Sequence, residues 1–218
     1  MEKEEVDLGS GTKRDIKIGI AIICVVLVVM CIAIPLMAAY NSLVDSDLQV
    51  HRAAANIKTD LERRADLLPN LATEIKGSAD FEHATIVDTI AARAGDASEI
   101  KNRIQTSDNV NDISQQESKL DTVFGGIMTL NEAYPTLQTT EQFKDFEAQT
   151  TATENEILVD RQTYNAAVMQ YQSVCRSFPT NMIAVYYGFT PDKYDMYVPI
   201  NQTNAETVPV VTFDFSNL

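Results

Sequence analysis

A short acidic segment with a histidine is the part of the sequence closest to a metal-binding pattern. Asp80, Glu82 and His83 lie within four residues, and carboxylates with an imidazole are common ligands of transition metals. A di-iron helical bundle requires two Glu-x-x-His pairs and two further inward glutamates. The other histidine, His51, has Leu48 at the matching position, so a second pair is missing. We therefore interpret this segment as the solvated start of a helix and predict no metal and no cofactor.

Common catalytic and nucleotide-binding motifs are missing from the sequence. It contains no G-x-S-x-G, H-E-x-x-H, G-x-x-x-x-G-K-[ST] or G-x-G-x-x-G. Of the three cysteines, Cys24 and Cys31 lie in an apolar run, and Cys175 is interpreted as a buried hydrophobic residue. The sequence thus predicts a non-catalytic protein. The alternative is a metal-dependent or catalytic protein that uses helix carboxylates together with His83.

Polar residues at positions where helical periodicity expects apolar ones form a more informative group. A lone buried charge costs several kcal/mol, so such residues need partners. We predict that Arg64 pairs with Asp160 or Glu117 and sets the register of the helices. The alternative is that the apolar stripes wind slightly and these side chains reach solvent. With two asparagines from nearby motifs, the candidate buried polar network is Arg64, Asn70, Glu117, Asp160 and Asn165.

Four blocks with helical periodicity position these residues. Apolar residues recur in steps of three and four over residues 43–77, 79–105, 109–134 and 139–178. Pro69 lies inside the first block, and the stripe keeps its phase across it, which favours a kinked continuous helix over a break. The last block keeps five heptads, a seam typical of a coiled coil or a bundle. Long amphipathic helices with short connections predict an antiparallel four-helix bundle, and the seam also allows copies of the chain to pair.

An apolar run near the N-terminus predicts a membrane anchor. Residues 18–39 are apolar or small and span about 33 Å as a helix, against about 30 Å for a bilayer core. A cleaved signal peptide has a shorter apolar region of about 7–15 residues. Tyr40 follows as an interfacial aromatic residue. We therefore predict a single transmembrane helix over residues 18–40 that contacts lipid.

Charge bears on orientation and on partners. Lys3, Lys13, Arg14 and Lys17 precede the run, whereas only Arg52 follows it closely, which places the N-terminus in the cytoplasm and the main domain outside. The net charge of −14 argues against nucleic-acid binding and against adhesion to anionic lipid through a basic face.

Aromatic residues crowd into the segment that follows Phe178. One interpretation is that this region folds back and covers one end of the bundle. The other is a docking surface for a protein partner. The candidate contact residues are Tyr186, Tyr187, Phe189, Tyr194 and Tyr197. Alternation over residues 207–215 predicts a short extended tail.

Several stretches resemble the LemA family of membrane-anchored bacterial and archaeal proteins. They are YNSLV at 40–44, RRADLLPNL at 63–71, TENEI at 153–157 followed by Arg161 and Tyr164-Asn165, and FPTNMIAVYYGF at 178–189. The resemblance covers about residues 15–215 in order. It implies one N-terminal anchor and a long antiparallel helical bundle, with no established activity or cofactor. It also implies an external N-terminus, opposite to the charge bias.

These observations combine into one expectation. The fold is all-α, with a flank at 1–17, a transmembrane helix at 18–40, an antiparallel four-helix bundle within 41–189 and a tail at 190–218 that packs on the bundle or is partly extended. The protein is a single-pass membrane protein of the cell envelope that acts as a scaffold, an adaptor or an assembly factor. Its protein partner is not identified by the sequence, and no nucleic-acid partner is expected.

Overall fold

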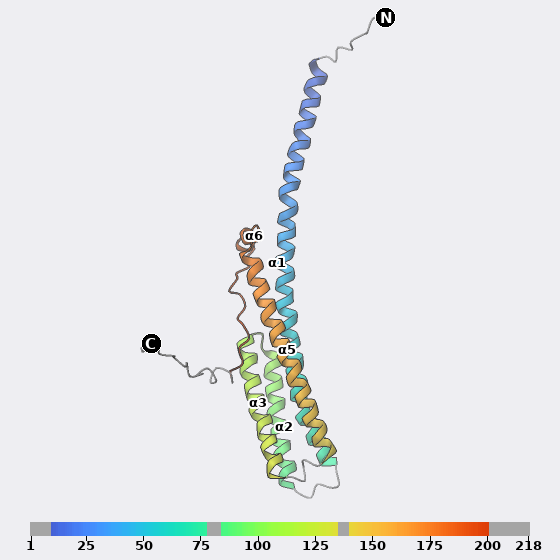
Figure 1. Ribbon diagram of the computed structural model, residues 1–218, viewed down its shortest axis with the longest axis vertical. Coiled ribbons are helices and arrows are strands. Elements are labelled where there is room, and N and C mark those ends of the chain that lie inside the picture. Colours follow the sequence, from blue (N-terminus) through green and yellow to red (C-terminus); the bar gives the residue numbers. More distant parts are fainter. Residues whose placement is uncertain (1–9, 78–83, 135–139, 201–218) are drawn as a thin grey trace, which may run out of the picture. The chain divides into compact units, whose positions relative to one another are not determined.

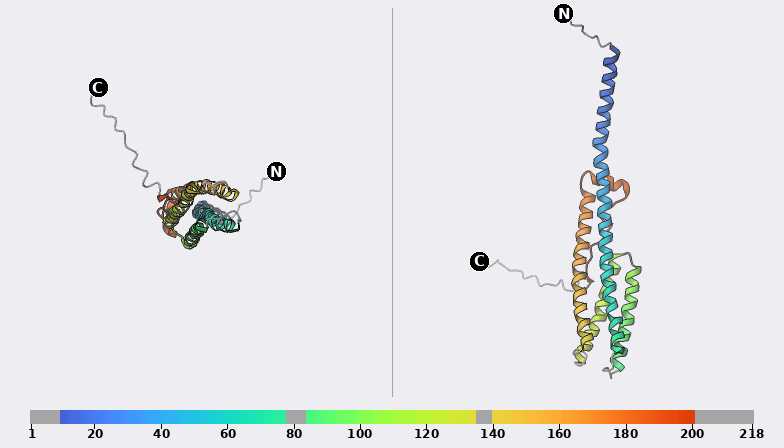
Figure 2. Two further views of the ribbon diagram at one scale, coloured as in Figure 1. Left: turned by 90° about the horizontal axis from the view of Figure 1, so that it is seen from below. Right: turned by 90° about the vertical axis from the view of Figure 1, so that its right-hand side faces the viewer.

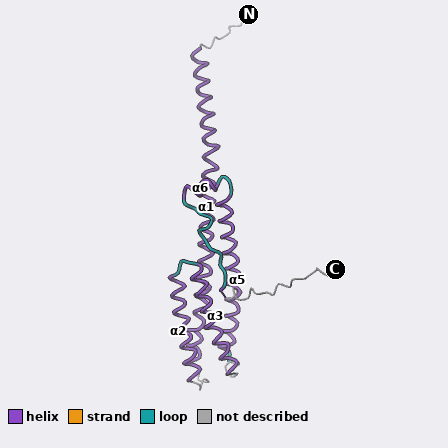
Figure 3. The backbone as a smooth tube through the Cα atoms, turned by 90° about the vertical axis from the view of Figure 1, so that its left-hand side faces the viewer, coloured by secondary structure: helices purple, strands orange, loops and turns teal. Residues whose placement is uncertain are grey.

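The computed structural model describes residues 10–77, 84–134 and 140–200. These residues form helices without any strand (Figures 1 and 3), which confirms the predicted all-α class. The helices are α1 (Ser10–Gly77), α2 (Ala84–Thr106), α3 (Val110–Ala133), α5 (Glu141–Arg176) and α6 (Thr180–Tyr187). The predicted segment with Asp80 and His83, and the tail beyond residue 200, lie outside the described residues.

The described residues fall into two compact units. Unit 1 consists of residues 10–46 and 171–191, and unit 2 consists of residues 47–77, 84–134, 140–170 and 192–200. Helices α1 and α5 each contribute to both units. Unit 2 contains every residue of the candidate polar network, whereas unit 1 contains the apolar run and α6.

In unit 2, segments of α1, α2, α3 and α5 run alongside one another (Figure 2). The side chains buried in this unit are mainly aliphatic and aromatic. Asp66 of α1 accepts a hydrogen bond from Lys101 of α2 at 2.6 Å, and α2 also packs directly on α3. Phe124 of α3 stacks on Phe146 of α5 with ring centroids 5.5 Å apart. The largest fully buried aliphatic side chains of this unit are Ile57, Leu61, Leu68, Leu71, Ile75, Ile86, Ile90, Ile104 and Leu120.

Local sequence accounts for the continuity of α1 and for the start of α3 in unit 2. Helix α1 continues through Pro69, as predicted, and the Thr73 hydroxyl donates a hydrogen bond to the Pro69 carbonyl at 2.9 Å. The Asn109 side chain caps α3 by accepting a hydrogen bond from the Asn111 backbone N–H. Lys58 of α1 donates hydrogen bonds to the carbonyls of Gln105 and Ser107, so the α2–α3 connection is held against α1.

Unit 1 contains the apolar half of α1 together with α6. Helix α1 is the one helix in the described residues that is long and apolar enough to cross a membrane, by length and composition. Large apolar side chains from Ile18 to Met37 are exposed, whereas Leu43 is fully buried. Cys175 is buried, as predicted. The backbone of α6 ends at Gly188, whose positive φ of 78° suits a residue without a Cβ.

Candidate functional site

Arg64 lies at the centre of the polar interior of unit 2. It is 3% exposed, and its guanidinium donates one hydrogen bond to Asp121 of α3 at 2.6 Å and another to Glu154 of α5 at 2.8 Å. The guanidinium also lies over the Phe124 ring, 4.7 Å from its centroid. The charge of Arg64 on α1 is therefore held by two carboxylates and one aromatic face, which come from α3 and α5.

These partners differ from the predicted ones. We expected Arg64 to pair with Asp160 or Glu117, because those residues occupy apolar positions of the stripes. Asp121 and Glu154 instead flank the stripes, directly after the buried residues Leu120 and Thr153. A long arginine side chain reaches past the apolar seam to the carboxylates at its margin, where water still contacts them.

Glu117 forms a second buried cluster. It is 2% exposed and accepts hydrogen bonds from the Arg161 guanidinium of α5 and from the Tyr197 hydroxyl, the latter at 2.5 Å. Burial raises the pKa of Tyr197, and the nearby Glu117 charge raises it further. The phenol therefore stays protonated and keeps donating to the carboxylate.

Residues 192–198, here called the strap, lie against the helices of unit 2. The Asn165 side chain exchanges two hydrogen bonds with the backbone of Tyr197, accepting at 2.8 Å and donating at 3.1 Å. The Ser114 hydroxyl donates to the Val198 carbonyl at 2.7 Å. The Tyr164 hydroxyl donates to the Asp195 carbonyl at 3.0 Å, and burial raises the pKa of Tyr164 to about 12. Three side chains of α3 and α5 thus satisfy the backbone of an irregular segment.

The strap is also bonded to α1. Lys193 donates a hydrogen bond to Asp47 at 2.7 Å, and the Tyr194 hydroxyl donates to the same carboxylate at 2.8 Å. The His51 ring lies 2.9 Å from the Tyr194 hydroxyl through its Nε2 atom. A cavity of about 360 Å³ borders this group and also contacts Tyr164.

The two arginines border a common cavity of about 520 Å³ whose walls also carry Asp121 and Glu154. Their positive charges already face three carboxylates, counting Glu117. An anionic ligand would therefore meet a surplus of negative charge in this interior.

The remaining members of the candidate network lie apart from these clusters. Asn165 joins the strap, as described above. Asp160 is half-buried, and burial raises the pKa of Asp60 of α1, with the charge of the neighbouring Asp160 raising it further. Asn70 is exposed and borders a small groove with Gln142 and Asp145. The candidate set thus supplies two buried clusters, one carboxylate pair and one surface residue.

Replacing Asp60 by asparagine is expected to stabilise the fold at neutral pH by about 0.5 kcal/mol. The raised pKa means that the folded chain binds a proton at pH values where the unfolded chain has released it, so the stability falls as the pH rises from 3.8 through the raised value. The variant should therefore lose its advantage below pH 3.8. Guanidinium chloride unfolding of the full chain in detergent micelles at several pH values measures this. Asp88→Asn, at an exposed position of α2, is the control, and an equal gain from it would contradict the prediction.

The five candidate contact aromatics separate between the units. Tyr186 and Tyr187 are exposed and Phe189 is half-buried, all in unit 1, whereas Tyr194 and Tyr197 belong to the strap. Tyr197 is 3% exposed, and its hydroxyl can be buried because it donates a hydrogen bond to the buried Glu117. This tyrosine therefore belongs to the interior of unit 2 and not to a docking surface.

Sequence reasoning missed three groups that matter in this interior. Asp121, Glu154 and Asp47 hold charged side chains of other elements, yet each occupies a position that periodicity assigns to a helix surface. Glu154 and Arg161 each carried a signal, since both stand in the family-like stretch that begins with TENEI at 153–157. In the described residues, no group of three or more His, Cys, Asp or Glu side chains is arranged to hold a metal ion.

The fold and the polar interior define an all-helical protein with one candidate membrane-spanning helix. The sequence profile of the LemA family matches residues 53–213, and the chain belongs to this family. Two proteins of Paramagnetospirillum magneticum, named magnetosome protein MamQ 1 and magnetosome protein MamQ 2, are similar to it. Each is 26% identical to the chain, over 89% of the chain and 76% of the relative.

Proposed function

We propose that this protein is a membrane-anchored, non-catalytic helical protein that acts through contacts with other proteins of the cell envelope, as a scaffold, an adaptor or an assembly factor. One observation carries the anchoring. The large apolar side chains between Ile18 and Met37 are exposed along a helix that bears no charge between Lys17 and Asp45. Such a surface is unfavourable in water and suited to hydrocarbon.

The arrangement of buried polar groups supports a non-catalytic role. Arg64, Glu117 and Arg161 bond to carboxylates, a guanidinium or a phenol of the same unit. A catalytic site holds its acid, base or nucleophile toward a space where substrate can enter. Buried pairs of this kind instead fix one packing of the helices. Both relatives are named as magnetosome proteins, and we propose by analogy that this chain also takes part in a larger cellular assembly.

Charge substitutions in the apolar run test the anchoring. A Val26→Glu, Val28→Glu double variant of the full chain introduces two carboxylates, each unfavourable by about 2.5–3.5 kcal/mol at the centre of a membrane helix. We expect the unchanged chain to stay in the membrane pellet after alkaline carbonate extraction and the variant to be released. Val159→Glu, at an exposed apolar position of α5, is the matched control and should stay in the pellet. Release of the unchanged chain would overturn the proposal.

Site-specific photocrosslinking in intact cells tests the protein contact. The crosslinking residue is placed in turn at exposed positions of α5 in unit 2, including Val159 and Met169. We expect adducts of discrete mass from neighbouring positions, and we expect the charged double variant to lose them. An absence of discrete adducts along the exposed faces of unit 2 would contradict a role in protein contact.

We also propose an orientation of the chain in the membrane. The flanking basic residues favour unit 2 outside the cytoplasm. Protease treatment of intact spheroplasts that carry a C-terminal tag on the full chain tests this, with a cytoplasmic protein as the lysis control. Digestion of the tag in intact spheroplasts supports an external unit 2, and digestion only after lysis places it in the cytoplasm.

A further inference from the structure

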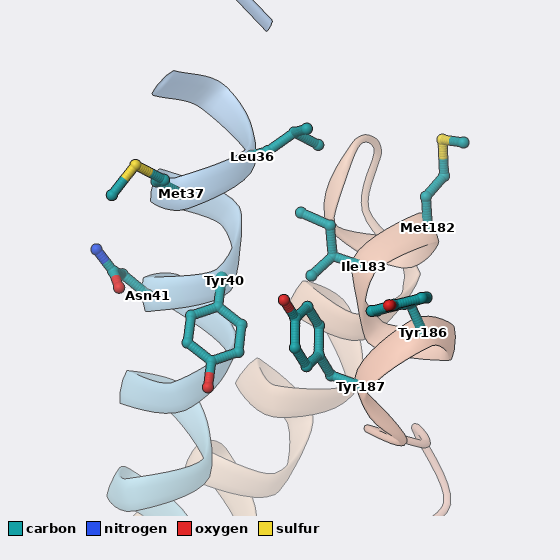
Figure 4. Close-up of a pocket in the computed structure, with 8 residues that line it drawn as sticks. All are labelled: Leu36, Met37, Tyr40, Asn41, Met182, Ile183, Tyr186 and Tyr187. Carbon is teal, nitrogen blue, oxygen red and sulfur yellow. The ribbon is translucent and has the colours of Figure 1, made fainter. Parts of the chain in front are cut away.

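Two uncharged stretches of the chain meet in unit 1. The first runs between Lys17 and Asp45 on α1, and the second runs between Arg176 and Asp192 and contains α6. They meet through aromatic rings, because the centroids of Tyr40 and Tyr187 are 4.8 Å apart. Figure 4 shows the two tyrosines facing each other across the gap between α1 and α6. Tyr40 directly follows the apolar run, at the level where a membrane helix leaves the hydrocarbon.

Helix α6 leaves most of its apolar side chains outside the protein. Met182, Val185 and Tyr186 of α6, and Phe178 just before the helix, are between 66% and 83% exposed. Fewer of its apolar side chains point inward; Ile183 and Ala184 are buried. A short helix with so much apolar and aromatic exposure is unusual for a surface in contact with water, especially in a chain whose net charge is −14.

The groove between α1 and α6 extends this apolar surface. It has a volume of about 470 Å³, and its walls carry Leu36 and Met37 of α1 opposite Met182 and Tyr186 of α6. Leu36 and Met37 belong to the run that we assign to the membrane. The exposed face of α6 is therefore continuous with the lipid-facing surface of α1 within the same unit.

We propose that α6 and the preceding Phe178 form a second membrane-contacting element, which lies in the interfacial region of the bilayer beside the end of the transmembrane helix. The occupant of this surface is lipid, at the boundary between headgroups and acyl chains. This inference rests on the proposed membrane anchoring of α1. Tyrosine favours that boundary because its ring is apolar and its hydroxyl is polar, and an uncharged segment enters the boundary without desolvating an ion.

Continuity and charge favour lipid over a protein partner. The surface adjoins the apolar run directly, and residues 177–191 carry no charge that would guide a specific protein contact. The segment also lacks the lysine and arginine residues by which many amphipathic helices bind anionic lipid. Its membrane contact therefore depends on apolar burial and on the proximity that α1 provides, and it does not require anionic headgroups.

The absence of tryptophan from the chain allows a direct test with single-tryptophan variants. Tyr186→Trp and Phe178→Trp report on α6, Val28→Trp reports on the middle of the apolar run, and Val159→Trp reports on an exposed site of α5 in unit 2. Each full-length variant is reconstituted into uncharged phosphatidylcholine vesicles, with acyl chains brominated close to the headgroup, brominated close to the chain end, or unbrominated. Circular dichroism checks that each variant keeps its helix content.

The expected result is a graded quenching pattern. The variants at Tyr186 and Phe178 lose most of their emission to bromine near the headgroup, and Val28→Trp loses most to bromine near the chain end. Val159→Trp keeps its emission in both and is quenched by aqueous acrylamide. Quenching of Val28→Trp without quenching at Tyr186 and Phe178 would overturn the role of α6 while leaving the anchor intact, and would favour a protein partner for α6. Failure of Val28→Trp to respond to any brominated lipid would overturn both proposals.

Discussion

Replacing Glu117 by leucine is expected to lower the free energy of unfolding by about 4 kcal/mol, the largest effect of a single substitution that we predict. The carboxylate is buried and accepts hydrogen bonds from Arg161 and from the Tyr197 hydroxyl. Leucine leaves a guanidinium that is only 19% exposed without a counter-ion, and it leaves a buried phenol without an acceptor. Guanidinium chloride unfolding of the full chain in detergent micelles, followed by circular dichroism, measures the loss.

A double-mutant cycle separates the ion pair from general packing. Arg161→Met removes the charge that Glu117→Leu leaves unpaired, so the double variant should recover at least about 1 kcal/mol of the summed single losses. Glu156→Leu is the matched control, because Glu156 pairs with Arg63 at an exposed site and should cost about 0.5 kcal/mol. Equal losses from the two leucine substitutions would show that Glu117 is not a buried partner of Arg161.

Replacing Arg64 by alanine is expected to lower the free energy of unfolding by about 2–3 kcal/mol, less than the Glu117 substitution. The reason is an asymmetry of burial. The arginine itself is buried, but the side chains of Asp121 and Glu154 are 34% and 53% exposed, so water can solvate both carboxylates after the guanidinium is lost. The remaining cost comes from the lost contact with Phe124 and from the space left in the interior.

Two further variants test this account with the same unfolding measurement. Arg64→Lys keeps the charge but cannot bond both carboxylates with one planar group, so it should lie between alanine and the unchanged chain. Arg63→Ala removes the neighbouring, exposed arginine and should cost about 0.5 kcal/mol. Indistinguishable losses for Arg63→Ala and Arg64→Ala would contradict the buried role of Arg64.

Helical periodicity predicted the secondary structure because it reports directly on burial. The stripe of α1 contains Ile57, Leu61 and Leu68, which the structure buries. Arg64 is the polar residue that the same stripe identified, and the structure buries it as well. The passage of α1 through Pro69 was predictable, since the apolar stripe keeps its phase through the proline. Periodicity does not tell which helix faces pack against each other. The predicted pairing of Arg64 with Asp160 or Glu117 was therefore wrong.

The sequence predicted a tail that packs on the bundle or is partly extended, but it did not predict the contacts by which residues 192–198 pack on unit 2. Residues 192–198 form no regular element, and their backbone is held by hydrogen bonds with the side chains of Asn165, Tyr164 and Ser114. Hydrogen bonds to a backbone do not depend on the side chains of the segment that is bound, so its sequence does not reveal them. The crowding of tyrosines was visible, but the sequence could not separate Tyr197, which is buried, from Tyr186, which is exposed.

The contact between Asp47 and Lys193 has a kinetic consequence. The two residues are 146 positions apart, so their bond closes a chain loop that contains nearly all of unit 2. Helix pairs with short connections form early because their loops are short, whereas this closure becomes favourable only after the helices have packed. We therefore expect the strap to be the last part of unit 2 to assemble and the first to open. Transient opening of the unit should begin with water reaching Glu117 and Arg161, before any helix unfolds.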